Sequence, residues 1–436
     1  MSRNRVVVVG TTSDYIDAVS RRLPGRAVFL TDRVEREGAR ERPPPEGAEV
    51  LCDLASPGEA LAALQAHLRR WRIMPSGVAC YDDESMALAV VVAGAFSLPA
   101  VPAAAVAACR SKLACKLRWR RAGLPCPQVA EVRRAADAVA FRDRVGGPIV
   151  LKPLTGSGSE LTFLCADAAE CIAAFGTLQR RLAEHRDARM YAPQGSGDAA
   201  VDPRQVFAVE EFVRGREHSC DFVVDGDRVE ILRLANKLPA ADESFGTTMA
   251  YVVPGELPSG MGLAAVGRQL GSAARALGVE RAMCMVDFIV RDGEALLLEL
   301  APRPGGDCLP PLVRRSCGLD MLAAALDFAE RRPVAAPPRE QWRRLVGLRL
   351  FATRPGTLAR VDTSGLVGDP RVLECTLKHG PGHRVVLPPE DYDSRILGHV
   401  VFDPEGIGDL EAACLELAAR VEVEMEPAEC PTATTC

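Results

Sequence analysis

The sequence predicts an α/β (α+β) protein made of about three compact units. Three observations predict it: the length of 436 residues, a β-branched run near the N-terminus followed by helix-like periodicity, and apolar strand-like runs further along. At roughly 150 residues per domain, this length exceeds one ordinary core. With 48% hydrophobic and 25% charged residues and a net charge of −5, the composition is that of a globular chain.

Residues 1–106 are predicted to form an N-terminal doubly wound α/β domain. The β-branched run Val6 to Val9 ends in a small polar turn, and a helical pattern follows from about Tyr15 to Leu23. Further strand-like runs lie at 27–30 and 77–81, and a helical pattern lies at 86–96. Gly10 does not begin a full Gly-x-Gly-x-x-Gly fingerprint, so a nicotinamide cofactor is disfavoured.

Residues 107–335 are predicted to form a central region. It opens with an amphipathic helix between Cys109 and Leu124 and continues with a strand at Ile149 to Pro153. Strand-like runs resume at 206–212, 221–225, 228–234, 284–290 and 295–300.

A Pro/Ala-rich stretch from about Pro333 to Arg339 indicates a boundary. Residues 336–436 are therefore predicted to form a C-terminal, mostly β unit that starts with Leu345 to Ala352. We expect the tail after about Glu426 to be frayed.

The composition also disfavours several classes of protein. Basic clusters such as Arg118 to Arg121 are short and mixed with acids, which disfavours nucleic acid as a partner. The run Val6 to Val9 is too short for a signal-peptide core or a membrane span, so we expect a cytoplasmic protein without a membrane partner. The 15 cysteines form no Cys-x-x-Cys pair and are interpreted as reduced thiols.

A lysine followed by a flexible loop is the first candidate site. Lys152 ends a predicted strand, and the loop after it contains Gly156, Ser157, Gly158 and Ser159. Small residues let backbone N–H groups approach phosphate oxygens, and the lysine supplies a positive charge. A surface turn beside an ordinary lysine is the alternative. The pattern is not a P-loop, because no Gly-Lys-Ser/Thr follows the glycines.

Acidic residues around a second strand end form another candidate. Glu210 and Glu211 are adjacent, and Glu217 comes after a glycine turn. Carboxylates in these places can accept hydrogen bonds from an adenine amino group and from ribose hydroxyls. A solvated edge strand is the alternative, because adjacent carboxylates are usually exposed.

Asp287 and Glu299 lie in two otherwise apolar runs and form the third candidate. A buried carboxylate needs a partner or a metal, since an unpaired charge in an apolar setting is costly. The two residues are 12 positions apart, so a three-residue loop 292–294 would bring them opposite each other, whereas a two-residue turn would place Leu298 opposite Asp287. Two carboxylates on one face, near phosphates, suit Mg²⁺.

Arginines offer the alternative account of these acids. One salt bridge per acid, with Arg303 or Arg281, would satisfy both. Arg303 follows Glu299 in a Pro/Gly turn, where it could clamp a phosphoryl group or a substrate carboxylate, or form a plain salt bridge.

The order of these motifs resembles the ATP-grasp superfamily and, within it, carboxylate–amine ligases of the L-amino-acid ligase (dipeptide-forming) type. The resemblance covers roughly residues 107–330 and implies that the central region 107–335 has two lobes, with a lid lobe at about 125–208. Lys112 and Lys152 are similar to the two ATP-binding lysines, and the loop after Lys152 is similar to the lid over the triphosphate. The residues that resemble the adenine hinge and the ribose-binding acid are Glu210, Glu211, Phe212, Val213 and Glu217.

The resemblance also assigns the chemistry. It implies that Asp287 and Glu299 bind magnesium and that Arg303 steadies the acyl-phosphate reaction. It implies an ATP- and Mg²⁺-dependent ligase that joins a small-molecule carboxylate, expected to be an amino acid, to an amine and releases ADP and phosphate. Ala301 departs from the family, many of whose members carry asparagine there as a metal ligand, so the number of magnesium ions stays open.

Two other functions stay open, as do the substrates and the oligomeric state. A bicarbonate-using carboxylase of the same superfamily is one, although no biotin-attachment or glutaminase segment is evident. A non-catalytic nucleotide-binding regulator is the other. The substrate pockets are expected to use residues such as Lys237, Phe245, Asp307 and Cys308, and the protein is expected to be a monomer or a homodimer.

Overall fold

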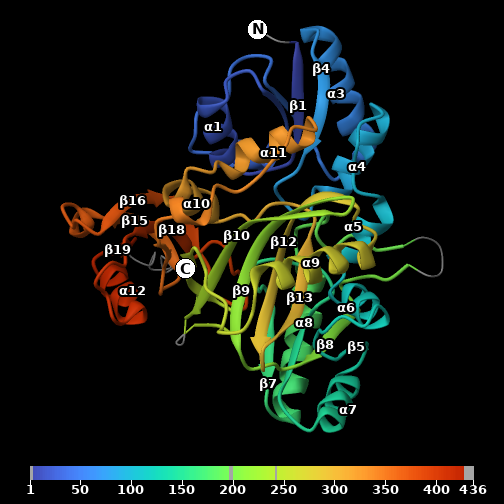
Figure 1. The fold of residues 1–436 in the computed structure, drawn as a ribbon, viewed down its shortest axis with the longest axis vertical. Helices are drawn as coiled ribbons and strands as arrows, with labels where there is room; N and C mark the ends of the chain where they lie inside the picture. The colour runs from blue at the N-terminus through green and yellow to red at the C-terminus, as the bar shows by residue number, and fades with distance from the viewer. Residues whose placement is uncertain (1–2, 196–199, 241–242, 427–436) are drawn as a thin grey trace, which may run out of the picture.

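The computed structural model describes residues 3–195, 200–240 and 243–426. Its first sheet is parallel, with strand order β3-β2-β1-β4 (Figure 1). The strands are β1 (Asn4–Val9), β2 (Ala27–Asp32), β3 (Glu49–Cys52) and β4 (Met74–Ala79), and the helices around them are α1 (Ser13–Arg22), α2 (Arg33–Gly38), α3 (Pro57–Trp71) and α4 (Met86–Ala95). Val6 and Val8 face one core while Val7 and Val9 face another, which explains the uninterrupted β-branched run. The predicted doubly wound α/β fold is confirmed here.

The second sheet lies at the opposite end of the molecule in Figure 1 and has the order β5-β8-β6-β7. Its strands are antiparallel: β5 (Val129–Val132), β8 (Phe207–Glu211), β6 (Ile149–Pro153) and β7 (Phe163–Cys165). Helices α7 (Ala135–Val145) and α8 (Ala168–Glu184) contribute Phe141 and Leu178 to its core.

An eight-stranded antiparallel sheet occupies the middle, with the order β13-β12-β9-β10-β11-β14-β18-β16. The strands are β9 (Arg216–Asp225), β10 (Arg228–Pro239), β11 (Thr248–Val253), β12 (Arg281–Arg291), β13 (Glu294–Ala301), β14 (Leu345–Phe351), β16 (Val372–Leu377) and β18 (Ile396–Phe402). Helices α5 (Ala103–Arg110), α6 (Lys112–Arg121) and α9 (Leu263–Leu277) share a core with β9, β10, β12 and β13. Helices α10 (Leu309–Cys317) and α11 (Met321–Ala329) join this sheet to the N-terminal one.

The last part of the chain both extends the central sheet and adds a small one. Strands β14, β16 and β18 continue the central sheet, while β15 (Gly356–Asp362), β17 (Arg384–Val385) and β19 (Glu422–Met425) form a three-stranded sheet beside α12 (Leu410–Ala419). The division into units at 106 and 335 stays a prediction. The expected frayed tail lies outside the described residues.

Two local expectations need correction. The helix expected between Cys109 and Leu124 is α6, which begins only at Lys112, because Ser111 leaves the helical conformation and its Oγ accepts a hydrogen bond from the Ala114 N–H at 3.2 Å. The loop between β12 and β13 has two residues instead of three. None of the helices in the described part of the chain has the length and hydrophobicity that a bilayer crossing requires.

Candidate active site

Two lysines enclose a buried carboxylate near the end of strand β8 in the four-stranded antiparallel sheet. Glu210, at the end of β8, is 2% exposed, and its oxygens lie 2.7 Å from Lys116 Nζ and 2.8 Å from Lys152 Nζ. Burial raises the pKa of Glu210, but the two ammonium groups lower it further, and the net shift is downward. Burial lowers the pKa of Lys152. Glu210 therefore fixes the positions of both lysines, and its oxygens are already engaged by them.

The glycine and serine loop lies against the neighbouring lysine. Lys112, at the start of α6, donates a hydrogen bond from Nζ to the Gly156 carbonyl at 2.5 Å. Gly156 and Gly158 have φ values of +128° and +64°, which side chains rarely tolerate. Ser159 Oγ donates to the Gly246 carbonyl at 2.9 Å, so the loop reaches the segment before β11. This loop thus borders the same space as Lys112.

Asp287 and Glu299 are directly opposite each other on β12 and β13, as predicted. The pairing is not produced by the predicted three-residue loop, however. Asp292 and Gly293, with φ values of +53° and +78°, form a two-residue turn between paired Arg291 and Glu294. A two-residue turn alone would have placed Leu298 opposite Asp287. A register shift between Asp287 and Phe288 leaves Leu298 as an extra residue, and this β-bulge restores the Asp287–Glu299 pairing. Lys116 donates to the Leu298 carbonyl.

Lys237, on β10, links two of the acids. Its ammonium group lies 2.9 Å from Asp287 Oδ2 and also pairs with Glu217. Burial and Asp287 raise the pKa of Glu217, while Lys237 lowers it, and the net shift is upward. The alternative pairing of Asp287 with Arg303 or Arg281 is wrong, because the described ion pair of Asp287 is with Lys237.

The carboxylate pair fits a magnesium ion that takes its other ligands from phosphates and water. Asp287 Oδ1 is buried and has no hydrogen-bond partner among the described residues. Glu299 Oε2 lies 3.8 Å from Lys112 Nζ, too far for a hydrogen bond. No group of three or more His, Cys, Asp or Glu residues in the described ranges could hold a metal by itself. Two carboxylates with an orphaned oxygen match the way Mg²⁺ is held, by a few carboxylates and substrate oxygens.

One cavity collects nearly all the residues predicted from the sequence. Its volume is about 130 Å³. Its lining includes Lys112, Lys152, Gly156, Ser157, Gly158, Ser159, Glu210, Glu211, Phe212, Val213, Glu217, Asp287 and Glu299. Lys237 and Phe245, which were expected in a substrate pocket, line this cavity too. Of the predicted site residues only Arg303 lies elsewhere.

Sequence reasoning missed the role of Lys116 in this cluster. The sequence offered one signal, because Lys116 lies four residues after Lys112 and therefore one helical turn away on the same face. A further signal is the rarity of lysine: the chain has only five lysines, and four of them, Lys112, Lys116, Lys152 and Lys237, lie in or beside this cavity.

Arg303 lies in an adjoining chamber of about 360 Å³ that shares Ser157 to Ser159, Asp287 and Glu299 with the first, lysine-lined cavity. Arg303 is paired with Asp83 from the N-terminal unit at 2.5 Å. The Asp83 partner raises the pKa of Arg303 despite its burial. Burial beside Asp82 raises the pKa of Glu84, which also lines the chamber, to about 8. The chamber therefore combines a fixed cation with acids from the N-terminal unit.

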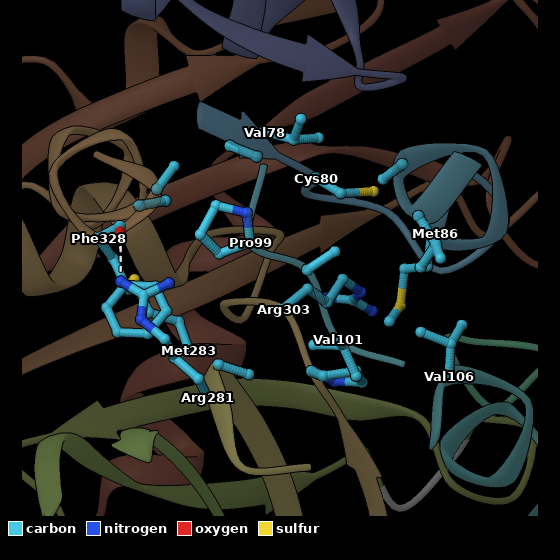
Figure 2. Close-up of a pocket in the computed structure, with 18 of the residues that line it drawn as sticks. Val78, Cys80, Met86, Pro99, Val101, Val106, Arg281, Met283, Arg303 and Phe328 are labelled. Carbon is cyan, nitrogen blue, oxygen red and sulfur yellow. Dashed lines mark hydrogen bonds between the residues drawn. The ribbon is translucent and has the colours of Figure 1, made fainter. Parts of the chain in front are cut away.

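A smaller, mainly apolar cavity lies on another side of Arg303 (Figure 2). Figure 2 shows Arg303 close to Pro99 and Val101, and Arg281 beside Phe328, whose carbonyl accepts a hydrogen bond from Arg281 Nη2 at 2.6 Å. The lining contains no carboxylate and none of the lysines, so this cavity is unsuited to a magnesium–phosphate group.

The sequence matches one family model and is similar to several known proteins. Residues 145–311 match the family model of the ATP-grasp domain. The chain is 28% identical over 307 residues to Uncharacterized protein y4rH of Sinorhizobium fredii, covering 70% of this chain and 59% of that protein. It is 28% identical over 243 residues to the D-alanine–D-alanine ligase of Ralstonia pickettii, covering 53% of this chain and 66% of the ligase. The chain thus spans about three fifths to two thirds of the length of these relatives.

Among solved structures, the fold is similar to the L-amino acid ligase from Bacillus licheniformis, with a TM-score of 0.78, 18% sequence identity, and coverage of 98% of this chain and 100% of that one. A biotin carboxylase from Campylobacter jejuni superposes with a TM-score of 0.65 and 14% identity, covering 96% and 92% of the two chains.

Residues 145–311 thus match an ATP-grasp domain, and the structure has the ATP-grasp fold. Within that fold, its whole described architecture is similar to that of the L-amino acid ligase.

Proposed function

We propose that the protein is an ATP-dependent carboxylate–amine ligase that forms an amide bond through an acyl phosphate. The observation that carries the proposal is the facing pair Asp287 and Glu299, set among lysines in one cavity that opens onto Arg303. Binding of a nucleotide alone would not require the second chamber. The D-alanine–D-alanine ligase and carnosine synthase relatives support a reaction of this class.

The proposed reaction has two steps. A carboxylate oxygen attacks the γ-phosphorus of ATP and ADP leaves; an amine nitrogen then attacks the acyl carbon, phosphate leaves with its oxygen, and the amine loses a proton. Catalysis of phosphoryl transfer is mostly positioning and charge neutralisation. Magnesium, when bound, supplies charge neutralisation at the phosphate oxygens.

We assign the roles of the residues as follows. Lys112 and Lys152 hold phosphate oxygens under the loop Gly156 to Ser159, and Asp287 and Glu299 hold magnesium. Arg303 faces the chamber and stabilises the charge that develops on the acyl phosphate. Glu211, Phe212, Val213 and Glu217 contact the nucleoside, and Glu210 acts on the phosphates through Lys116 and Lys152.

The test is nucleotide product analysis of the full chain with Mg-ATP and pairs of L-amino acids. We expect ADP and phosphate in equal amounts with an amide product, because the site is built for γ-phosphoryl transfer. AMP as the stoichiometric product would refute the proposal. ADP release that depends on bicarbonate would instead support the carboxylase, and ATP binding without turnover with any pair would support a regulator.

A further inference from the structure

A second and larger cavity opens from the far end of the chamber. Its volume is about 810 Å³, against about 360 Å³ for the chamber, and the two share the side chains of Tyr15, Asp307 and Lys378. Small-molecule sites measure roughly 300–1,000 Å³, so the outer cavity alone has the size of a complete binding site. A substrate that occupies both spaces is longer than a single amino acid.

Four polar side chains meet where the two cavities join. Arg349 Nε lies 2.7 Å from Asp307 Oδ2, and Lys378 Nζ lies 3.8 Å from Asp307 Oδ1. Arg349 on β14 and His399 on β18 are directly opposite each other in the sheet, so their side chains share one face. Arg349 pairs with Asp307 directly, whereas Lys378 Nζ lies beyond hydrogen-bond distance of that carboxylate.

His399 is the group that most clearly lacks a partner. It is 6% exposed and lines the outer cavity, yet neither ring nitrogen has a hydrogen-bond partner among the described residues. A buried polar group without a partner is costly. Burial lowers the pKa of His399, so the ring is neutral near pH 7 and offers one donor and one acceptor. A ligand group in the cavity would satisfy it.

The distribution of lysine along the chain is a separate observation that points to a ligand at this cavity. Lysine and arginine total 53, of which five are lysine, so 48 are arginine. Exposed ion pairs such as Arg21–Asp17 and Arg134–Asp137 use arginine. Three lysines line the cavity that contains Asp287 and Glu299, Lys116 is buried beside it against Glu210, and the fifth is Lys378. Four of the five compact ammonium groups, which suit a small anionic ligand, therefore lie at cavities.

We propose that Lys378 and His399 bind the carboxylate of an extended, peptide-like amine acceptor whose amino group reaches the chamber beside Asp287 and Glu299. This inference rests on the proposed ligase function. Asp14 and Asp393, which line both cavities, offer acceptors to the N–H groups of such a chain. The acceptor class is thus a short peptide with a free carboxylate, rather than a simple amine.

The test compares binding of glycine, triglycine and triglycinamide to the full chain by isothermal titration calorimetry in the presence of Mg-ADP. We expect triglycine to bind about tenfold or more tightly than either of the others, which is the size of a hydrogen bond to a charged group. Equal affinities of triglycine and triglycinamide would overturn the inference, as would tighter binding of the amide or no binding of triglycine.

Variants test which side chains cause the preference for triglycine. Lys378→Met should remove the preference for triglycine, Lys378→Arg should restore part of it, and His399→Gln should weaken triglycine binding while leaving Mg-ADP binding unchanged. Arg384→Met removes an exposed cation six residues from Lys378 and should change nothing. An unchanged preference in Lys378→Met would overturn the inference. Failure of the ligase proposal is recognised separately, by the absence of substrate-dependent ADP release.

Discussion

The lysine-lined cavity and the outer cavity are assembled in different ways. The first is built from short motifs, each of which carries its chemistry within a few residues, such as Lys152 with Gly156 to Ser159. The second joins α1 to the start of α10 and to the strands β16 and β18, which come hundreds of residues later in the sequence. Motifs of the first kind are visible in a sequence, whereas a site of the second kind exists only after folding.

Two buried acids in the lysine-lined cavity differ in how their oxygens are paired, and we expect them to have different roles. Glu210 has both oxygens paired with lysines, while Asp287 pairs through one oxygen and keeps the other unpartnered among the described residues. Loss of Glu210 should therefore act first on stability, and loss of Asp287 or Glu299 should act first on catalysis. The first two predictions test this separation.

The largest expected effect is that of Glu299→Gln, which should reduce kcat by roughly 10²–10³-fold, comparable to the loss of one preorganised charge-stabilising group. Asp287→Asn should be nearly as damaging, since Ala301 supplies no third ligand. Both proteins should melt within a few degrees of the wild type. Steady-state ADP release and thermal melting measure the two effects, and Glu294→Gln, at the exposed end of the same hairpin, is the matched control. Normal turnover in Glu299→Gln would remove the metal assignment.

Glu210→Gln should mainly destabilise the fold, by about 3 kcal/mol, because two buried ammonium groups lose their counter-charge. Glu211→Gln, at the adjacent and more exposed position, should change stability by less than about 0.5 kcal/mol. The pKa of Glu210 is lowered in the folded state, so its contribution is present above its unfolded pKa and is lost as the pH falls through the folded value. Urea unfolding at neutral and acidic pH measures both; equal stabilities of the two variants would contradict the prediction.

The sequence predicted the fold class, and thirteen of the fourteen proposed site residues line one cavity. It succeeded there because a lysine at a strand end or an acid in an apolar run has few structural explanations. It missed Lys116, whose partner Glu210 is 94 positions away, and it named Asp307 without its partner Arg349. Pairings of this kind depend on how sheets and helices pack, which local patterns do not encode.

Lys152→Ala tests whether a single lysine contributes both to ATP binding and to the stability of the fold. The lysine both faces the lysine-lined cavity and pairs with Glu210, but Lys116 remains to neutralise that carboxylate. We expect the KM for ATP to rise by about tenfold, as for one charge-assisted contact, and stability to fall by about 1–2 kcal/mol. Initial rates across ATP concentrations and urea unfolding measure these effects. Unchanged ATP kinetics together with a collapsed melting temperature would show that the lysine is only structural.

The smallest effect is expected at the hairpin turn, where the predicted loop length was wrong although the pairing was right. Gly293 has a φ of +78°, and a Cβ added there would have no neighbouring atom within 4 Å, so Gly293→Ala should cost about 1 kcal/mol through backbone strain alone. Gly293→Asn should cost less, because asparagine tolerates this conformation better. Neither should alter kcat, since the bulge at Leu298 and the paired strands hold Glu299 opposite Asp287. A fall in kcat approaching that of Glu299→Gln, measured beside the urea unfolding curves, would mean that the turn rather than the bulge sets the register of the Asp287–Glu299 pair.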